Sequence, residues 1–261
     1  MGAIVKRCRM AVVALGVLAA AGSAQAGMES GQMQAASVSG TTEWLQAGGS
    51  EWKALTANQA FSGGDRIRTG QDGNVVLGLW EGNTVQLFSN CEFAVQTLRH
   101  DAAQKQVEYI FGVTKGKITA KIPSVSPGSK VQFETPVTTV EVPVTAADPS
   151  LTLTVNPDGS VTVQSDEGTI RTARSTDPVF SMTLTGGAQA LVEFDAAGGS
   201  ITVTNSGTVP FEVTGPDGNP ITLNPGDSVK FDASGAATFI PGAPPVDAPA
   251  GESIGEPVSG G

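Results

Sequence analysis

The residue types that perform nucleophilic, acid–base and metal chemistry are few in this sequence. A serine or cysteine nucleophile usually relies on an imidazole base, and His100 is the only histidine among 261 residues. It lies in the polar stretch TLRHDAAQ, where we expect a solvated loop. A histidine-based metal site usually needs two or three such ligands. The sequence therefore predicts no catalytic triad, no metal site and no cofactor.

Carboxylates are the remaining candidates for acid–base chemistry, because a pair of them can cleave a glycosidic bond. The chain has 25 acidic residues, so pairs are available without any special arrangement. The candidates are Glu92, Glu108, Glu134, Glu141 and Glu193. None lies in a recognisable motif, so we expect solvated strand faces and keep a glycan-acting hydrolase as an alternative. The turns NPDG, GPDG and QDG match a calcium-binding loop poorly.

The stretch GGDRIRTG, Gly63 to Gly70, is the best candidate for a phosphate-binding loop. Such a loop needs a Gly-Lys-Ser/Thr ending and a helix that begins there, and the stretch has neither. The alternation of Arg66, Ile67 and Arg68 instead predicts a half-buried strand with Ile67 on one face. Asp65 is expected to accept hydrogen bonds from nearby backbone N–H groups. We interpret the stretch as a turn that leads into a strand.

Cys91 and the three tryptophans each have a structural and a functional interpretation. Cys91 lies in FSNCEFAV between apolar positions, which favours a buried thiol over a reactive or intermolecular one. Trp44, Trp52 and Trp80 could stack on sugar rings or on a peptide if they were exposed together. Because each lies among alternating apolar residues, we expect core packing. Replacement of Trp52 by alanine should then damage folding before it damages any ligand contact.

The first 26 residues have the pattern of a cleaved secretory leader. Lys6, Arg7 and Arg9 precede a short apolar run, and Ala24 and Ala26 occupy the small-residue positions at its end. The apolar run is shorter than the roughly 20 residues that a bilayer span needs. We therefore expect an exported protein, periplasmic or extracellular, with no membrane insertion of the mature chain.

The charge and the cysteine content restrict the partners and the covalent structure. The chain has 15 basic and 25 acidic residues, and its formal net charge is −10. The predicted leader contains basic residues and no acidic one, so the mature chain is more acidic still. Such a surface repels nucleic acid and anionic lipid, and we expect no nucleic-acid partner. Removal of Cys8 with the leader leaves Cys91 alone, which excludes an intrachain disulfide.

Short segments with a two-residue alternation, bounded by glycine turns, predict an all-β fold. Clear examples are NVVLGLW from Asn74 and SVTVQ from Ser160, and Asp-Gly and Glu-Gly pairs supply the turns. The best helical candidate is RHDAAQKQVEYIF, residues 99–111. GGDRIR at Gly63 and PGDSVK at Pro225 repeat one pattern, a Gly-Asp turn followed by a strand.

Composition divides the chain into successive parts. We expect a signal peptide over 1–26, a flexible lead-in over 27–36, a first β domain over 37–174, a second β unit over 178–240 and a disordered Pro/Gly/Ala-rich tail over 241–261. The boundary after Arg174 is placed at STDPVF, because proline removes a donor from a strand ladder. The second unit either folds independently or completes the core of the first.

Motifs between about residues 37 and 173 occur in an order typical of one protein family. They include GGDRIRTGQDGNVVLGLWEGNTVQL from Gly63, FETP from Phe133 and VNPDGSVTVQSDEGTI from Val155. In these motifs the chain resembles the FecR domain, a periplasmic domain named for the ferric-citrate regulator. The resemblance implies a twisted β-structure, either a short β-solenoid or a sandwich-like fold. The motif residues, all expected to be structural, are Gly64, Asp65, Arg66, Ile67, Arg68, Thr69, Gly70, Asp72, Gly73, Gly82, Thr135, Pro136, Asp158 and Gly159.

The best-known FecR proteins couple an outer-membrane transporter to a sigma factor across the inner membrane. They carry a cytoplasmic segment and a membrane helix before the domain, where this sequence has the predicted leader. Residues 148–151, Asp-Pro-Ser-Leu, stand where the family usually has an Arg-Gly-Thr motif. We therefore expect a non-catalytic protein that recognises an envelope protein or a cell-wall polymer, first by β-augmentation. A periplasmic regulator linked to a sigma factor is the second alternative.

Overall fold

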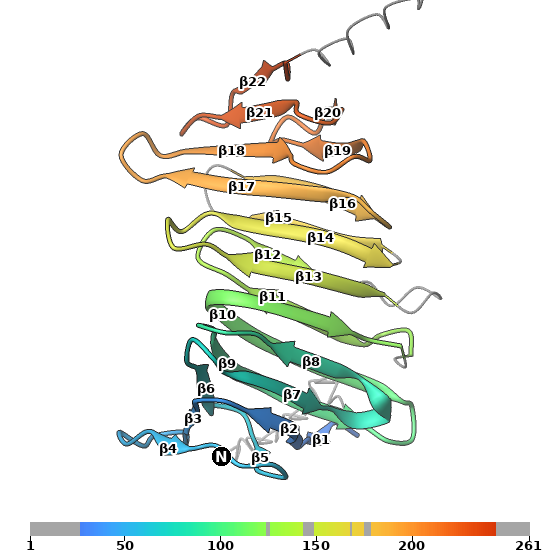
Figure 1. Cartoon of the computed structure of the whole chain (residues 1–261). Helices are drawn as coiled ribbons and strands as arrows, with labels where there is room; N and C mark the ends of the chain where they lie inside the picture. Colours follow the sequence, from blue (N-terminus) through green and yellow to red (C-terminus); the bar gives the residue numbers. More distant parts are fainter. Residues whose placement is uncertain (1–26, 124–125, 143–148, 168, 175–178, 244–261) are drawn as a thin grey trace, which may run out of the picture.

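The computed structural model describes residues 27–123, 126–142, 149–167, 169–174 and 179–243. These residues form an all-β fold, in which one three-residue 3₁₀ turn is the only helical element described. Figure 1 shows the strands stacked from the N-terminal end at the bottom to the C-terminal end at the top. In this part of the chain no helix has the length and hydropathy to cross a membrane. The predicted leader, with Ala24 and Ala26, and the predicted tail beyond residue 243 lie outside the described residues.

Two sheets face each other across one apolar core. In pairing order, sheet A contains β4 (Lys53–Ala54), β3 (Thr42–Leu45), β6 (Arg66–Thr69), β9 (Glu92–Asp101), β10 (Gln106–Lys121), β11 (Lys130–Glu134), β12 (Thr139–Glu141), β15 (Thr169–Arg174), β16 (Phe180–Thr185), β19 (Phe211–Thr214) and β20 (Pro220–Leu223), with β1 (Glu29–Ser30) beside β9.

Sheet B contains, in pairing order, β5 (Ala60–Phe61), β2 (Met33–Ser39), β7 (Asn74–Gly78), β8 (Thr84–Leu87), β10, β13 (Ser150–Val155), β14 (Val161–Glu167), β17 (Gln189–Asp195), β18 (Ser200–Asn205), β21 (Ser228–Phe231) and β22 (Ala237–Ile240). The 3₁₀ turn η1 (Trp80–Gly82) lies between β7 and β8. Among the described pairs β10 and β11 run parallel, and the others are antiparallel. β10 belongs to both sheets and joins them.

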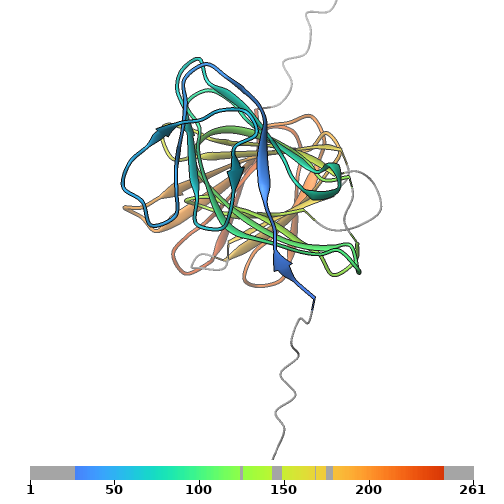
Figure 2. The ribbon, with the colours of Figure 1, turned by 90° about the horizontal axis from the view of Figure 1, so that it is seen from below.

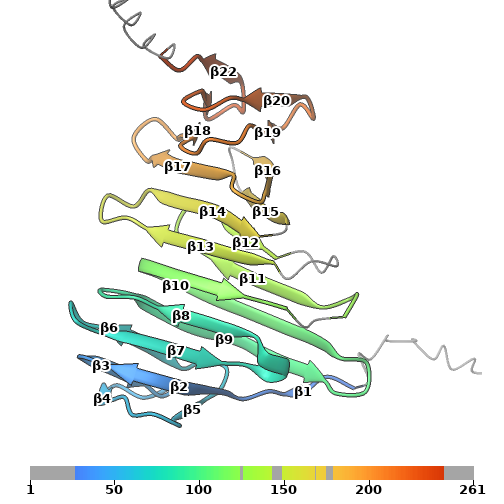
Figure 3. The same ribbon diagram turned by 45° about the vertical axis from the view of Figure 1, so that its right-hand side comes forward.

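From β13 onward the chain places successive hairpins on alternate sheets. The hairpins β13–β14, β17–β18 and β21–β22 lie in sheet B, and β15–β16 and β19–β20 lie in sheet A. From β15 onward each hairpin also pairs with the preceding hairpin of its own sheet, as β17 does with β14. Figure 3 shows this alternation along the upper half of the stack. Because β15 pairs with β16 in sheet A and β14 pairs with β17 in sheet B, both sheets continue from the first predicted β unit into the second.

The two-residue alternation places one face of each strand in the core between the sheets. Ile201 and Val203 of β18, for example, are fully buried. The largest side chains gather at Phe111 of β10, whose ring centroid lies 5.1 Å from that of Phe93 and 5.4 Å from that of Phe133. These three rings come from the neighbouring strands β9, β10 and β11 of sheet A. Figure 2 looks along the stack from below, with the N-terminal strands nearest.

The turn at Gly64 ties the start of β6 to β9. Gly64 has a φ of +95°, which glycine adopts readily because it has no Cβ. Its N–H donates to the carbonyl of Val95 at 2.6 Å, and the N–H of Val95 donates to the carbonyl of Asp65 at 2.8 Å. The N–H of Asp65 closes the turn on the carbonyl of Ser62 at 3.2 Å. The register between the two strands is therefore fixed at the turn itself.

The same set of bonds recurs twice in the C-terminal half. The N–H of Gly226 donates to the carbonyl of Asn205 at 2.9 Å, and the N–H of Asn205 donates to the carbonyl of Asp227 at 2.9 Å. The turn TGGA over residues 185–188 forms the equivalent pair with Ser165, at 2.6 and 3.0 Å. The repeat predicted from GGDRIR and PGDSVK is thus present as one local geometry. Its third copy has alanine in place of aspartate, which hides it in the sequence.

Two segments differ from the sequence predictions. Residues 27–36, predicted as a flexible lead-in, contain β1 and the start of β2, where Met33 and Ala35 are fully buried. Residues 99–111, the best helical candidate, form the end of β9, a turn and the start of β10. His100 is consequently a strand residue and not a loop residue. β1 of the first segment pairs with β9, which lies far from it in the sequence. In the second segment the end of β9 pairs with the start of β10.

β10 leaves sheet A and enters sheet B at Gly116. Lys115 is the last residue that pairs with β9, and Gly116 is the first that pairs with β13, opposite Val155. Gly116 has a φ of +85°, and a Cβ built there would lie 2.5 Å from the Cα of Cys91. A side chain at this position would therefore collide with backbone, which cannot move without displacing β9.

We expect Gly116→Ala to lower the free energy of unfolding by about 3 kcal/mol or more, since backbone displacement adds to the left-handed strain of about 1–2 kcal/mol. Gly159→Ala is the matched control, because Gly159 has the same φ of +85° and open space around its Cα. Its free energy of unfolding should fall only by the cost of the left-handed backbone strain, about 1–2 kcal/mol. Denaturant titration measures both variants, and equal losses would contradict the crowding at Gly116.

Candidate functional site

The residues of GGDRIRTG hold a turn and a strand together. Ile67 is fully buried, and the arginines on either side of it point to the outer face of sheet A. The carboxylate of Asp65, itself buried, accepts hydrogen bonds from the N–H groups of Ala47 and Ser62, both at 2.8 Å. The acceptor capacity of this carboxylate is therefore directed at its own backbone, and the stretch is a turn that leads into a strand.

The remaining motif residues are also occupied by local contacts. The hydroxyl of Thr69 donates to the carbonyl of Phe88 at 2.5 Å and accepts from the N–H of Cys91 at 2.8 Å. Asp72 accepts from the N–H of Thr41 at 3.0 Å. In or beside the other connections between strands lie Gly70, Gly73, Gly82, Thr135, Pro136, Asp158 and Gly159. The structure brings none of these residues into the hollow that His100 lines, and Thr135 and Pro136 border a separate, smaller one.

Two of the five candidate carboxylates share a hollow. Glu134 and Glu141 line a hollow of about 340 Å³ on the outer face of sheet A. Glu134 accepts from the amide of Gln96 at 3.0 Å, and Arg171 pairs in register with Glu141 on the neighbouring strand. The two carboxylates come from diagonal positions of β11 and β12, where backbones are roughly 7–8 Å apart.

The other three carboxylates are dispersed. Glu108 forms an ion pair with Arg99 at 3.3 Å, Glu92 accepts from the hydroxyl of Thr114 at 3.4 Å, and Glu193 is exposed on β17. Within the described ranges no group of three or more His, Cys, Asp or Glu side chains could hold a metal ion.

The largest hollow among the cavities described, about 500 Å³, lies near the N-terminal end of the stack. We call it the Trp80 cavity. Its walls include the rings of Trp80 and His100, and its rim carries the amides of Gln32, Gln34 and Asn58. It forms where the chain passes from β1 in sheet A to β2 in sheet B. The outward positions of β2 and the inner residues of β9 and β10 consequently meet there.

Aromatic groups dominate the interior of the Trp80 cavity. The ring centroids of Trp80 and His100 lie 5.4 Å apart with an interplanar angle of 31°. Nδ1 of His100 is buried, and no described residue forms a hydrogen bond with it. Burial raises the pKa of Tyr109 to about 12, against a smaller opposing effect of a backbone hydrogen bond from Trp80, so its hydroxyl stays neutral. No Lys, Arg, Asp or Glu is among the described residues that line the cavity.

The sequence did not identify this cavity, although one signal for it was present. In GQMQAA the glutamines alternate with the buried Met33 and Ala35, so Gln34 and Ala36 share the outer face of β2, and Gln32 directly precedes the strand. The partners of these side chains on η1 and β9 follow only from the strand pairing.

The three tryptophans occupy three different environments. Trp44 packs edge-to-face on Phe61 at 6.1 Å, and Trp80 lies in the wall of its cavity. Trp52 lies on the outer face of sheet A, where the guanidinium of Arg68 is 4.2 Å from its ring centroid. The prediction of core packing is therefore wrong for Trp52, because cation–π contacts with outward arginines hold it in place of the core.

Cys91 is fully buried, in agreement with the structural interpretation. Burial raises the pKa of its thiol to about 12, and the charge of Glu92 contributes in the same direction. The thiolate, which is the reactive form, is thus strongly disfavoured at neutral pH.

Comparison with known proteins identifies neither a family nor a function for this chain. No family model matches the chain, and no curated protein matches its sequence. Two crystal structures of a "putative anti-sigma factor" from Parabacteroides distasonis ATCC 8503 align with TM-scores of 0.38 and 0.39 at 12% sequence identity. Each alignment covers 61% of this chain and 59% of the other. Likeness at this level is too slight to carry an argument about function.

The position of Trp52 predicts a small effect of its removal. We expect Trp52→Ala to lower the free energy of unfolding by about 0.5–1 kcal/mol, the usual size of an exposed cation–π contact. Phe111→Ala, at the centre of the aromatic cluster, should lose about 3–5 kcal/mol. Thermal and denaturant unfolding measure both variants. If Trp52→Ala lost as much stability as Phe111→Ala, Trp52 would have to pack in the core.

Hydrogen bonds lower the pKa of several turn aspartates. The N–H of Gly242, followed by the backbone and amide of Asn224, holds the pKa of Asp227 below its usual value. The hydroxyl of Ser234 has the same effect on Asp232. The other turn aspartates with a lowered pKa are Asp72, Asp158 and Asp217. Each is charged in the folded protein at a pH where the unfolded chain is already protonated.

Acid should therefore destabilise the protein. A carboxyl whose pKa is lowered by folding stabilises the fold above the unfolded value of about 3.9, and the stabilisation is lost as the pH falls through the folded value. We expect the melting temperature of the wild type to decrease as the pH is lowered below about 4. Asp227→Asn should have a lower melting temperature than the wild type at pH 7, and its melting temperature should depend less steeply on pH in acid. Glu193→Gln, at an exposed position, is the control. An unchanged profile for Asp227→Asn would contradict the assignment.

Proposed function

We propose that this protein is a non-catalytic recognition protein of the cell envelope, which pairs with a strand of a partner protein at the C-terminal end of its stack. The observation that supports this most directly is the exposure of Phe239 on β22. Phe239 stands in register with Val229 of β21, so both side chains lie on the same, inward face of sheet B. Val229 is fully buried, whereas Phe239 is 47% exposed.

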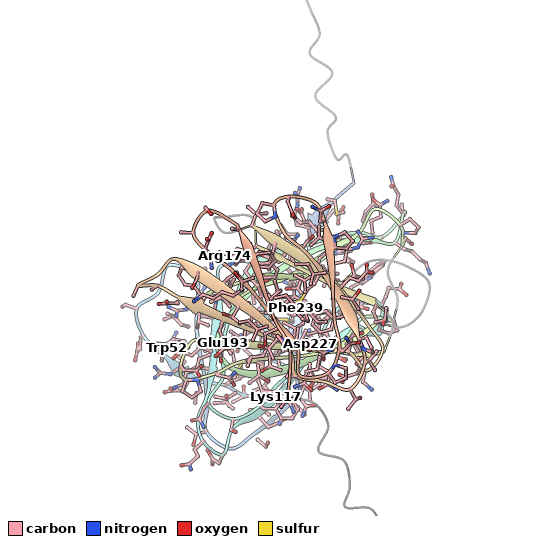
Figure 4. All side chains as sticks on the ribbon, turned by 90° about the horizontal axis from the view of Figure 1, so that it is seen from above. Trp52, Lys117, Arg174, Glu193, Asp227 and Phe239 are labelled. Carbon is pink, nitrogen blue, oxygen red and sulfur yellow. The ribbon has the colours of Figure 1, made fainter. Side chains whose placement is uncertain are left out.

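The exposure follows from the alternation of hairpins. β22 pairs with β21, and within the described residues no strand pairs with its other edge. The last hairpin of sheet A, β19–β20, precedes the last hairpin of sheet B, β21–β22. The position that the next strand of sheet A would occupy, beside β20, therefore faces Phe239. Figure 4, which looks down on this end, labels Phe239 near the middle of the molecule.

A partner strand that adds to β20 would continue sheet A and cover Phe239. Within the described residues β20 pairs only with β19, so its other edge offers backbone donors and acceptors. Open strand edges accept strands of other proteins, and alternate side chains of the incoming strand supply specificity. The partner that fits is therefore a segment with apolar residues at every second position.

Envelope extracts can test this proposal with a matched pair of variants. We expect the mature protein and Phe194→Ser to retain the same envelope protein. Phe239→Ser should retain at least tenfold less of it. Phe194 is a suitable control because it is also exposed, at 37%, but lies on β17. Hydrogen exchange of the complex should show new protection in residues 220–223 and 237–240. Retention by Phe239→Ser, or protection elsewhere only, would contradict the proposed edge.

Export, which the envelope role requires, has its own test. Cleavage after Ala26 would create an α-amino group at Gly27, whose Cα lies so close to Asp101 that a Cβ there would collide with its carboxylate. We expect the exported protein to begin at Gly27 by N-terminal sequencing. Asp101→Asn should then destabilise the processed protein by about 1–2 kcal/mol more than the unprocessed one. A mature end elsewhere, or equal losses, would contradict this.

A regulator linked to a sigma factor is the second candidate, and the ordered FecR-like motifs favour it. It predicts that a sigma factor, or the transporter that signals to it, co-purifies with the full chain. The envelope-recognition proposal predicts a partner of another class at the same edge.

We further propose that the protein has no hydrolytic activity. The hollow with Glu134 and Glu141 is the place where a glycan hydrolase would have its acid and base. The position of Arg171 directly opposite Glu141 on the neighbouring strand, and the hydrogen bond from Gln96 to Glu134, support a structural role for both carboxylates. Release of reducing ends from peptidoglycan, abolished in Glu134→Gln, would establish the hydrolase instead.

A further inference from the structure

We propose that the Trp80 cavity binds an uncharged saccharide. The cavity lies at the opposite end of the stack from β20 and β22, so this inference does not depend on the strand edge. Its volume of about 500 Å³ is within the usual range of about 300–1,000 Å³ for small-molecule sites.

The walls of the cavity fit the apolar face of a sugar ring. Trp80 is partly buried against the core, which fixes the plane of its indole, and His100 stacks on it at 5.4 Å. An immobilised aromatic ring in the wall of a cavity offers a large apolar contact at low conformational cost. Leu79 and Leu98, both nearly buried, extend this apolar surface.

The rim of the cavity fits the hydroxyl or acetamido groups of the same ring. The carboxamides of Gln32, Gln34 and Asn58 each provide donors and an acceptor, which matches hydroxyl groups that both donate and accept. Gln32 and Gln34 are exposed, and they stand two residues apart on one face of the chain.

Other ligand classes fit the cavity less well. Phosphate-bearing ligands need cationic side chains or clustered N–H groups, and no Lys or Arg is among the described lining residues. A cationic ligand would need carboxylates, which are also absent from that lining. A fatty chain would leave the three amides without partners. The combination of an aromatic wall with a neutral amide rim leaves a saccharide as the best match.

Binding can be measured with defined probes on the full mature protein. Suitable probes are N,N′-diacetylchitobiose, cellobiose and maltose, with saturation-transfer NMR and tryptophan fluorescence as independent readouts. We expect at least one probe to bind with a Kd of about 1 mM or tighter, and Gln34→Ala to weaken it about tenfold. Trp80→Ala should abolish binding, although its contact with the core also lowers stability.

A variant that fills the cavity separates binding from folding. Ala36 is exposed and lines the cavity, so Ala36→Phe should remove saccharide binding without a change in melting temperature. Trp52→Ala, which removes a tryptophan from another face, should retain binding. The proposal is overturned if none of the three probes binds the wild type when the probe concentration is about ten times that Kd. It is also overturned if Ala36→Phe binds the probe as tightly as the wild type does. Capture of a peptide in place of the sugars at this cavity would also overturn it.

Discussion

A hairpin of this protein has one apolar face, and it can bury that face only against a hairpin of the opposite sheet. This constraint accounts for the alternation of β13–β14, β15–β16, β17–β18, β19–β20 and β21–β22 between the two sheets. Each new hairpin covers the one before it and leaves its own face to the next. Contacts such as that between Phe180 of sheet A and Phe231 of sheet B, 6.4 Å apart, are the result. The stack therefore grows in steps, and its shape follows the chain order.

A stack of this kind needs a fixed register, since a shift by one residue would turn every apolar side chain outward. The turns at Gly64, Gly187 and Gly226 provide it, because each glycine and the residue after it exchange backbone hydrogen bonds with one residue of the neighbouring strand. The aspartates at 65 and 227 add a carboxylate that accepts from the backbone three residues earlier. Alanine at 188 lacks that carboxylate and keeps the same backbone bonds, so the backbone pair is the essential element.

Local patterns predicted what depends on nearest neighbours in the sequence. Alternation identified the all-β class, the inward position of Ile67 and the burial of Cys91, because each depends on the two-residue period of a single strand. Predictions failed where a distant strand decides the outcome. Residues 27–36 were predicted to be flexible, but they pair with β9 and β7. Trp52 was predicted to pack in the core, but the arginines of β6 lie against its ring on the outer face. The Trp80 cavity was missed for the same reason, since its lining residues come from five separate segments.

Both candidate binding surfaces lie where the regular alternation stops. At the C-terminal end sheet B extends one hairpin beyond sheet A, and the uncovered inward position is that of Phe239. At the N-terminal end the chain crosses from β1 to β2 between the sheets, and the crossing leaves space that polar amides and an indole line. A continuous stack covers its own apolar faces and has none to offer to a ligand. Both proposed binding sites therefore lie at the two ends of the stack, and the long middle section separates them.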